Sequence, residues 1–194
     1  MTHPNVDLKL LVSVLDQHNV EYVVVGGIGA MAYGATRPTQ DLDCVVEQSI
    51  GNLKNLAAAL VDLHATLRVS GMSDEEAANL KIPLRWEMLQ RMALSTWRTT
   101  GGDLDLLSDI PGTDKKRISY EDMTAEAVLI DLNGITIRVA PLQVIVESKE
   151  AANRPKDKEA LPELYELLSQ KKQSPEPLFE PEGSSKPKRR GYPK

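Results

Sequence analysis

The sequence is poor in cysteine and aromatic residues, and it has no long hydrophobic run and no excess of positive charge. A single cysteine, Cys44, excludes an internal disulfide and is typical of a protein of the reducing cytoplasm. No segment approaches the roughly 20 apolar residues of a membrane-spanning helix, and the N-terminal segment lacks the basic start of a signal peptide. We therefore expect a cytoplasmic protein with no membrane partner. The net charge of −5 means that any nucleic-acid contact must use local patches.

The composition that is present predicts one globular domain followed by a tail. The chain has 194 residues, of which 41% are hydrophobic and 26% charged, which is enough to bury one core. Residues 1–172 carry periodic apolar patterns. Residues 173–194 are rich in proline, glycine and basic side chains and nearly free of large apolar ones, so we predict a disordered tail.

Hydrophobic periodicity predicts an alternation of helices and strands. Helical spacing over 6–18 precedes a buried strand over 21–25, a glycine turn and a short helix over 28–34. A strand over 41–46 and a helix over 50–67 follow. Residues 73–92 read as mixed helix and loop, because Ser73 and Glu76 form a capping-box pair while Pro83 interrupts any long helix.

The second half predicts two hairpins and two helices. One hairpin pairs 93–99 with 103–108 across Gly101 and Gly102, and the other pairs 126–132 with 135–140 across Asn133 and Gly134. Helices are predicted from Pro141 and from Pro155, since proline is favoured at the first helical position. The order of elements predicts an α+β fold with a small mixed sheet flanked by helices and ending in C-terminal helices.

The segment from Val23 to Val46, VVVGGIGAMAYGATRPTQDLDCVV, combines a glycine turn with two nearby carboxylates. Side chains alternate along a strand, so Asp41 and Asp43 share one face. Two adjacent carboxylates repel unless a cation lies between them, and Mg²⁺ characteristically binds one or two carboxylates together with substrate phosphates. Gly26 and Gly27 would let the backbone approach a phosphate closely. The combination indicates nucleoside triphosphate chemistry.

Each part of this segment also has an ordinary structural explanation. A glycine pair between a strand and a helix is often a packing device, and D-x-D on a strand is often a solvated face. Two better-known phosphate motifs are excluded, because the segment lacks both the G-x-G-x-x-G spacing of dinucleotide-binding proteins and the G-K-[ST] of a P-loop. The specific signal is the joint occurrence of glycine turn, RPT and DLD in one unit.

This pattern resembles the signature of polymerase-β-type nucleotidyltransferases, in which a GG or GS turn is followed by a D-x-D metal site. Here GG is followed by thirteen residues and then DLD. The later GGDLDLLSDIPG is similar to the third acidic strand of that superfamily. The segment PLQVIVESKEAANRPKDKEALPEL looks like the S-K-x-x-A-x-R-x-K-D ending of the AbiEii/MenT toxin-like group. The resemblance runs in patches from about residue 20 to 168.

The resemblance implies a metal site and a phosphate site. Asp41 and Asp43 would hold Mg²⁺ at the triphosphate of an NTP, and Gly26 and Gly27 would cradle the phosphates. Asp105 would be the third carboxylate and help to activate the attacking hydroxyl. Asp103 shares its face, so the choice between the two acids stays open, although the alternating apolar context favours Asp105.

The resemblance further implies roles for four residues outside the acidic strands. Lys149 and Arg37 would neutralise the triphosphate, and Asp157 would belong to the catalytic set. From its position alone, Asp157 is also explained as an acid in the first turn of a helix, where it favours the helix dipole. Thr39 could hydrogen-bond a phosphate, and in related toxins a hydroxyl at this point is a regulatory phosphorylation site.

The resemblance points to a toxin that adds nucleotides to the 3′ end of tRNA, with a cognate antitoxin as partner. Basic residues around Trp86 and Trp97 and the run 115–117 fit a single-stranded RNA end, and they equally fit a solvated face with buried tryptophans. The alternatives are transfer to a small hydroxylated molecule or to a protein hydroxyl, and an inactive module that keeps only the fold.

Overall fold

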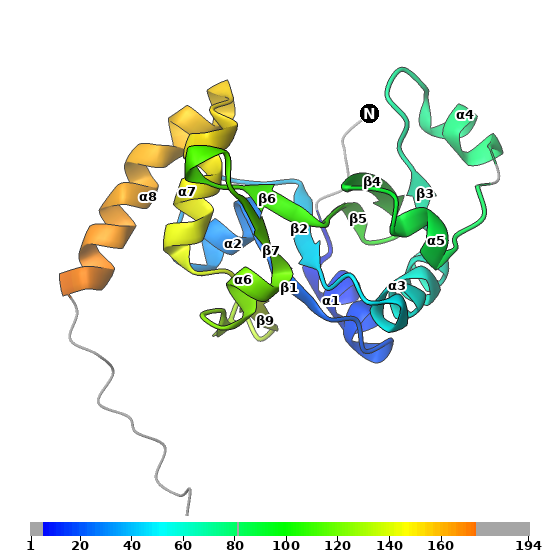
Figure 1. Ribbon diagram of the computed structural model, residues 1–194, viewed down its shortest axis with the longest axis horizontal. Coiled ribbons are helices and arrows are strands. Elements are labelled where there is room, and N and C mark those ends of the chain that lie inside the picture. Colours follow the sequence, from blue (N-terminus) through cyan, green and yellow to red (C-terminus); the bar gives the residue numbers. More distant parts are fainter. Residues whose placement is uncertain (1–5, 81, 174–194) are drawn as a thin grey trace, which may run out of the picture.

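The computed structural model describes residues 6–80 and 82–173 (Figure 1). Its centre is a seven-stranded sheet in the order β3-β4-β5-β2-β1-β9-β8. The strands of this sheet are β1 Tyr22–Val24, β2 Asp41–Val46, β3 Thr66–Leu67, β4 Leu94–Thr99, β5 Gly102–Leu107, β8 Val128–Asp131 and β9 Thr136–Val139. A separate short hairpin consists of β6 Asp109–Pro111 and β7 Arg117–Ser119.

The sheet is mixed. Strand β2 is antiparallel to β1 and parallel to β5, β1 is parallel to β9, and the hairpin partners β4–β5 and β8–β9 are antiparallel. The predicted α+β class with a small mixed sheet is therefore confirmed. Because β2 is central and β5 lies beside it in the same direction, side chains at equivalent positions of these two strands come into contact.

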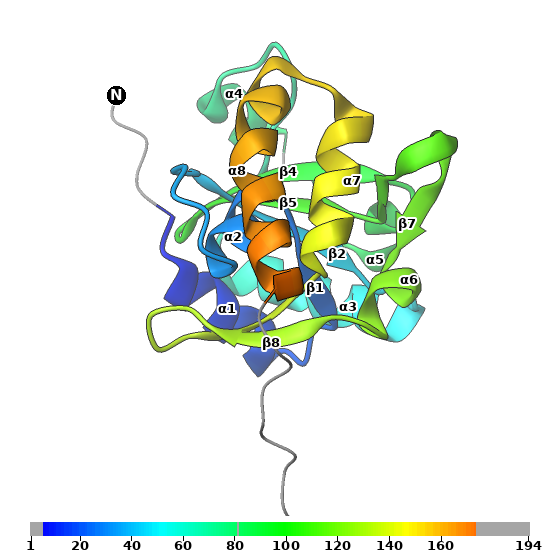
Figure 2. The same ribbon diagram turned by 90° about the vertical axis from the view of Figure 1, so that its left-hand side faces the viewer.

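Helices cover both faces of the sheet. In Figures 1 and 2, α7 and α8 lie side by side with α2 on one face, and α1 and α3 lie on the other. The helices are α1 Leu8–Gln17, α2 Gly26–Ala32, α3 Ile50–Asp62, α4 Asp74–Asn79, α5 Trp86–Leu89, α6 Tyr120–Thr124, α7 Leu142–Ala152 and α8 Pro155–Gln173, with a 3-10 turn at Thr113–Lys115.

Most predicted elements are present, with local corrections. The predicted helix over 50–67 is wrong in its last part: α3 ends at Asp62, because His64 adopts a left-handed backbone (φ 49°), and Thr66–Leu67 forms the edge strand β3. The reciprocal hydrogen bonds of Ser73 and Glu76 cap α4 as predicted.

The two predicted hairpins are confirmed. Asn133 and Gly134 both have positive φ, 57° and 81°, as a tight hairpin turn after β8 requires. In the first hairpin the turn is shifted by one residue, because Gly102 already pairs with Thr99 in the sheet. The β6–β7 hairpin and α6 were not predicted.

Helix α8 ends close to the predicted start of the tail at residue 173. Gln173 is the last residue of α8, so the helix continues past residue 172. Residues 174–194 lie outside the described residues. Within the described ranges, no helix has the length and apolar character that crossing a membrane requires.

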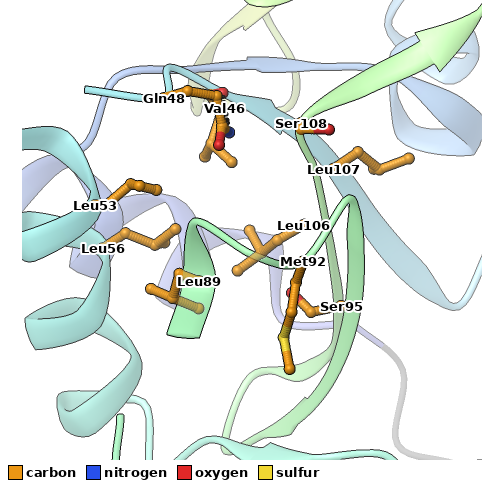
Figure 3. A pocket seen from close by; sticks show the side chains of 10 residues that line it. All are labelled: Val46, Gln48, Leu53, Leu56, Leu89, Met92, Ser95, Leu106, Leu107 and Ser108. Atoms are coloured by element: carbon orange, nitrogen blue, oxygen red, sulfur yellow. Dashed lines mark hydrogen bonds between the residues drawn. The ribbon is translucent and has the colours of Figure 1, made fainter. Parts of the chain in front are cut away.

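The core is aliphatic, as the scarcity of aromatic residues predicts. Leu42, Cys44 and Leu104 are completely buried between the sheet and the helices. A narrow, mainly apolar cleft lies between α3, α5 and the ends of β2 and β5 (Figure 3). Its lining residues include Val46, Leu53 and Leu106, but none of the aspartates considered below.

Candidate active site

The parallel pairing of β2 with β5 brings the predicted acids together. Asp41 lies opposite Asp103, and Asp43 lies opposite Asp105. Asp41, Asp43 and Asp105 each offer a carboxylate oxygen within 4.8 Å of the others, and all three side chains are partly buried. The two sequence segments, more than 60 residues apart, therefore form one acidic cluster.

The structure distinguishes Asp103 from Asp105. Asp103 is occupied by two arginines, since its carboxylate lies 3.0 Å from Arg68 Nη1 and 2.6 Å from Arg98 Nε. By contrast, Oδ1 of Asp105 is buried with no hydrogen-bond partner. A buried carboxylate oxygen without a donor is costly unless something binds it. Asp105 is thus the third member of the cluster, and Asp103 is a structural ion-pair partner beside it.

The glycine turn packs directly against the acidic cluster. Gly26 begins α2 with a φ of 61°, and a Cβ atom there would lie 1.9 Å from Oδ2 of Asp43. A Cβ on Gly27 would lie 2.6 Å from Oγ1 of Thr39. Both positions therefore need glycine: the first for its backbone conformation and both for close approach. Both glycines are partly buried, and the backbone of Gly27 hydrogen-bonds to the carboxylate of Asp43.

Electrostatics in the cluster favour a bound cation. Burial, together with the charges of Asp41 and Asp105, raises the pKa of Asp43 to about 7. Burial also raises the pKa of Asp105, against a hydrogen bond from Thr96 that lowers it. Three carboxylates that destabilise one another in this way are stabilised by a divalent ion.

The residues present fit a hard divalent metal. The donor set consists of carboxylate oxygens, which suit Mg²⁺, and one of them, Oδ1 of Asp105, has no other partner. A metal site at Asp41, Asp43 and Asp105 agrees with the set that the sequence predicted.

The predicted Lys149 and Asp157 meet at the corner between α7 and α8. Asp157 is completely buried and lies 3.5 Å from Lys149 Nζ and 2.6 Å from Arg154 Nε. Burial alone would raise the pKa of Asp157, but the hydrogen bond and charge of Arg154, with the charge of Lys149, hold it below its ordinary value. Asp157 thus holds two cations in place and is not one of the clustered acids.

Two cations near the cluster were missed by sequence reasoning. The charge of Lys156 lowers the pKa values of Asp43 and Asp105, and the pKa of Arg154 is raised by Asp157 and, to a smaller extent, by Asp43 and Asp41. Arg154 and Lys156 belong to the segment ANRPKDK, which was considered only for its resemblance to the C-terminal motif of the toxin-like group. Its unusual density of basic residues at the start of a helix was the available signal.

Arg37 and Thr39 lie in the loop between α2 and β2. The guanidinium of Arg37 is 2.5 Å from Glu159 of α8, and the hydroxyl of Thr39 donates to Oδ1 of Asp41 at 2.5 Å. The loop therefore joins α8 to the cluster. The predicted contacts of these two residues with a triphosphate stay predictions.

Part of the basic and aromatic cluster predicted for RNA is used within the fold. Trp97 is 1% exposed and donates from Nε1 to Ser95 Oγ, so it cannot stack on a base. Trp86 packs partly buried against the core, and Arg98 is paired with Asp103. Lys81 lies outside the described residues. The alternative of buried tryptophans is confirmed for Trp97.

Solved structures share this fold. The lincomycin-bound lincosamide antibiotic adenylyltransferase LnuA aligns with a TM-score of 0.54 at 14% identity, over 84% of this chain and 99% of its own. The antibiotic-resistance factor ANT(2'')-Ia, in complex with adenylyl-2''-tobramycin, aligns with a TM-score of 0.55 at 15% identity, over 85% of this chain and 89% of its own. No protein-family model matches the chain, and a search of curated proteins found no match.

These likenesses establish the architecture. The chain has the polymerase-β-like nucleotidyltransferase fold that the sequence predicted. At identities this low they establish the fold alone, and they do not show the toxin subgroup.

Proposed function

We propose that this protein is a metal-dependent nucleotidyltransferase that transfers a nucleoside monophosphate from an NTP to a hydroxyl group. The observation that carries the proposal is the convergence of Asp41, Asp43 and Asp105 beside the Gly26–Gly27 turn, on a fold shared with adenylyltransferases. Asp41, Asp43 and Asp105 would hold Mg²⁺, which when bound supplies positive charge to the triphosphate.

The protein's own groups have distinct tasks in this reaction. The acceptor oxygen attacks the α-phosphorus, the bond from that phosphorus to the bridging oxygen of the β-phosphate breaks, and pyrophosphate leaves. Asp105 would accept the proton of the attacking hydroxyl, and in the metal-free protein burial raises the pKa of this carboxyl above its ordinary value. The glycine turn gives the phosphates a backbone surface without side chains.

The cations at the α7–α8 corner suit the triphosphate end of the substrate. Lys149 is held at 3.5 Å from Asp157, and Arg154 is held by the same carboxylate, so both are pre-positioned. Lys156 contributes a further positive charge on the acidic cluster. These charges would stabilise the departing pyrophosphate.

For the acceptor, the observations favour a small hydroxylated molecule over the 3′ end of tRNA. LnuA is a lincosamide antibiotic adenylyltransferase, and ANT(2'')-Ia was solved in complex with adenylyl-2''-tobramycin. In addition, Trp97, one of the two aromatic residues that supported RNA stacking, is in the core. Transfer to tRNA, as expected of a toxin with a cognate antitoxin, and transfer to a protein hydroxyl are alternative outcomes of the test.

Thr39 would also be a regulatory phosphorylation site in this enzyme. A phosphate on its hydroxyl would remove the hydrogen bond to Asp41 and place a dianion beside the metal ligands. Phosphate analysis of protein isolated from cells should then find a modified fraction with lower transferase activity. Protein in which Thr39 is unmodified under every growth condition contradicts this regulation.

The first experiment measures transfer directly. Purified protein is incubated with Mg²⁺ and each α-labelled nucleoside triphosphate, in parallel with a panel of aminoglycosides and lincosamides, with total tRNA, and with no added acceptor. Asp41→Asn is the matched control, since it removes one metal ligand without changing side-chain volume.

The identity of the labelled product distinguishes among the proposed functions. Label on a small hydroxylated molecule with the wild type only supports the proposal in full. Label in tRNA, or on a protein hydroxyl, supports nucleotidyl transfer but shows that the acceptor is not a small hydroxylated molecule. Absence of transfer to every acceptor, together with no binding of NTP or metal, would establish an inactive module that keeps only the fold.

A further inference from the structure

The hydroxyl of Thr39 is committed to a side chain of the cluster. It donates to Oδ1 of Asp41 at 2.5 Å, a short hydrogen bond of the kind expected for a charged acceptor. A hydroxyl has one proton to donate, so the donation to Asp41 leaves none for a phosphate. In this arrangement the hydroxyl of Thr39 acts on the carboxylate of Asp41.

Thr39 is itself held by its surroundings. Its Cβ and Oγ1 lie 2.6 Å from the position that a Cβ of Gly27 would occupy, so the side chain is packed against the glycine turn. Its side chain therefore has a defined orientation, and that orientation fixes which oxygen of Asp41 is occupied. The second oxygen of Asp41 remains for the metal.

The loop that carries Thr39 is in turn fastened to α8. The backbone N–H and the hydroxyl of Thr36 both donate to Oε1 of Glu163, at 2.7 and 2.8 Å, and Arg37 pairs with Glu159 at 2.5 Å. Glu159 and Glu163 are four residues apart and so lie on one face of α8. Three short contacts thus connect this face of the C-terminal helix to the segment immediately before β2.

We infer that Thr39 is a positioning residue for the metal ligand Asp41 and that α8 acts on the metal site through Glu163, Thr36 and this loop. The inference rests on the proposed function. It assigns Thr39 and Glu163 to the orientation of a metal ligand, and it assigns Arg37 to fastening the loop.

The test measures metal affinity in the absence of nucleotide. Mn²⁺ is titrated into the full-length protein by isothermal calorimetry, with Mn²⁺ electron paramagnetic resonance as a second readout. Thr39→Val removes the hydroxyl and keeps the shape, and we expect Mn²⁺ binding to weaken about 10- to 100-fold, as for other partners that orient metal ligands. Thr39→Ser keeps the hydroxyl and should restore affinity to within about twofold of the wild type.

Glu163→Gln tests the connection from α8. It keeps an oxygen that can accept from Thr36 but removes the negative charge, so it should weaken Mn²⁺ binding about fivefold, because hydrogen bonds to a charged acceptor are the stronger ones. In the Thr39→Val background it should have no further effect, because the loop acts through that hydroxyl. Glu166→Gln is the matched control, since Glu166 is an exposed α8 carboxylate that accepts a hydrogen bond from Gln170 of the same helix. It should bind Mn²⁺ as the wild type does.

The outcomes separate this inference from the proposed function. Wild-type affinity in Thr39→Val, while Asp41→Asn loses binding, overturns the positioning role and leaves the nucleotidyltransferase proposal intact. Failure of Thr39→Ser to restore affinity also overturns it, because packing and not the hydroxyl would then be responsible. If the wild type itself binds no Mn²⁺, both are overturned. Thermal unfolding of each variant shows that the fold is retained.

Discussion

Replacement of Asp43 by asparagine should stabilise the metal-free protein. Asp43 has a pKa of about 7 in the folded protein against an ordinary value of 3.8, because burial and two neighbouring carboxylates disfavour its charged form. One pKa unit corresponds to about 1.4 kcal/mol, so ionised Asp43 lowers the free energy of unfolding by up to about 4 kcal/mol above pH 7. Asp43→Asn removes that charge at nearly constant volume.

The sign of the pH dependence follows from the raised pKa. The folded protein binds this proton more tightly than the unfolded chain, so the wild type is most stable, with respect to this group, below about pH 4. Its stability falls as pH rises towards about 7 and is then constant. The difference between Asp43→Asn and wild type should therefore be near zero at pH 4 and largest at pH 8.

The measurement is urea unfolding of both proteins at these two pH values, in EDTA and in excess Mg²⁺. Mg²⁺ should raise the stability of the wild type by about 1.4 kcal/mol at ten times its dissociation constant and raise that of Asp43→Asn less. Asp103→Asn is the control, and it should lower the free energy of unfolding, because it leaves Arg68 and Arg98 without their carboxylate. An Asp43→Asn protein that is no more stable than wild type at pH 8 in EDTA refutes the reasoning.

Three further predictions concern the turn, the third acid and the C-terminal corner. Gly26→Ala should abolish transfer and lower the melting temperature, because its Cβ would lie 1.9 Å from a carboxylate oxygen. Gly71→Ala, at a φ of 83° with open space around it, should show only a backbone cost of about 1 kcal/mol in unfolding and keep full activity. Asp105→Asn should reduce kcat about 10²- to 10⁴-fold with the fold intact, and residual transfer near the wild-type rate would exclude it as the base. Asp157→Asn should lower the free energy of unfolding by about 3 kcal/mol, since two cations lose a buried partner. Because the pKa of Asp157 is lowered in the folded protein, that loss should shrink as pH falls below about 4, and a loss that is constant with pH contradicts the ion-pair explanation.

Local patterns carried much of the prediction because their physical causes are local. Alternation of side chains along a strand is sufficient to place Asp41 and Asp43 on one face, and positive φ at Asn133 and Gly134 follows from the turn that those residues favour. The capping box of Ser73 and Glu76 is likewise complete within four residues. These features formed as predicted because no distant contact opposes them.

Other features depend on partners far along the chain. The choice between Asp103 and Asp105 is decided by Arg68, which directly follows β3, and by Arg98 of β4, since both pair with Asp103. The burial of Trp97 likewise follows from its place on a strand inside the sheet. Neither is settled by a linear pattern, since the alternating acidic strand places both carboxylates on one face and only favours Asp105, and a tryptophan among basic residues fits both a core and a surface.

The glycine turn and the pair of carboxylates lie within one short unit of the sequence, and together with the order of elements and the later motifs they were sufficient to predict the fold and to propose Asp41 and Asp43 as metal ligands. The tertiary structure alone decided which third acid joins them, where Arg37 and Thr39 point, and that α8 is fastened to the loop before β2. The physical reason is the separation along the chain of the residues that each interaction joins. Backbone conformation and side-chain alternation are set by neighbours in the chain, whereas ion pairing and burial are set by whichever residues the sheet order brings within a few ångströms.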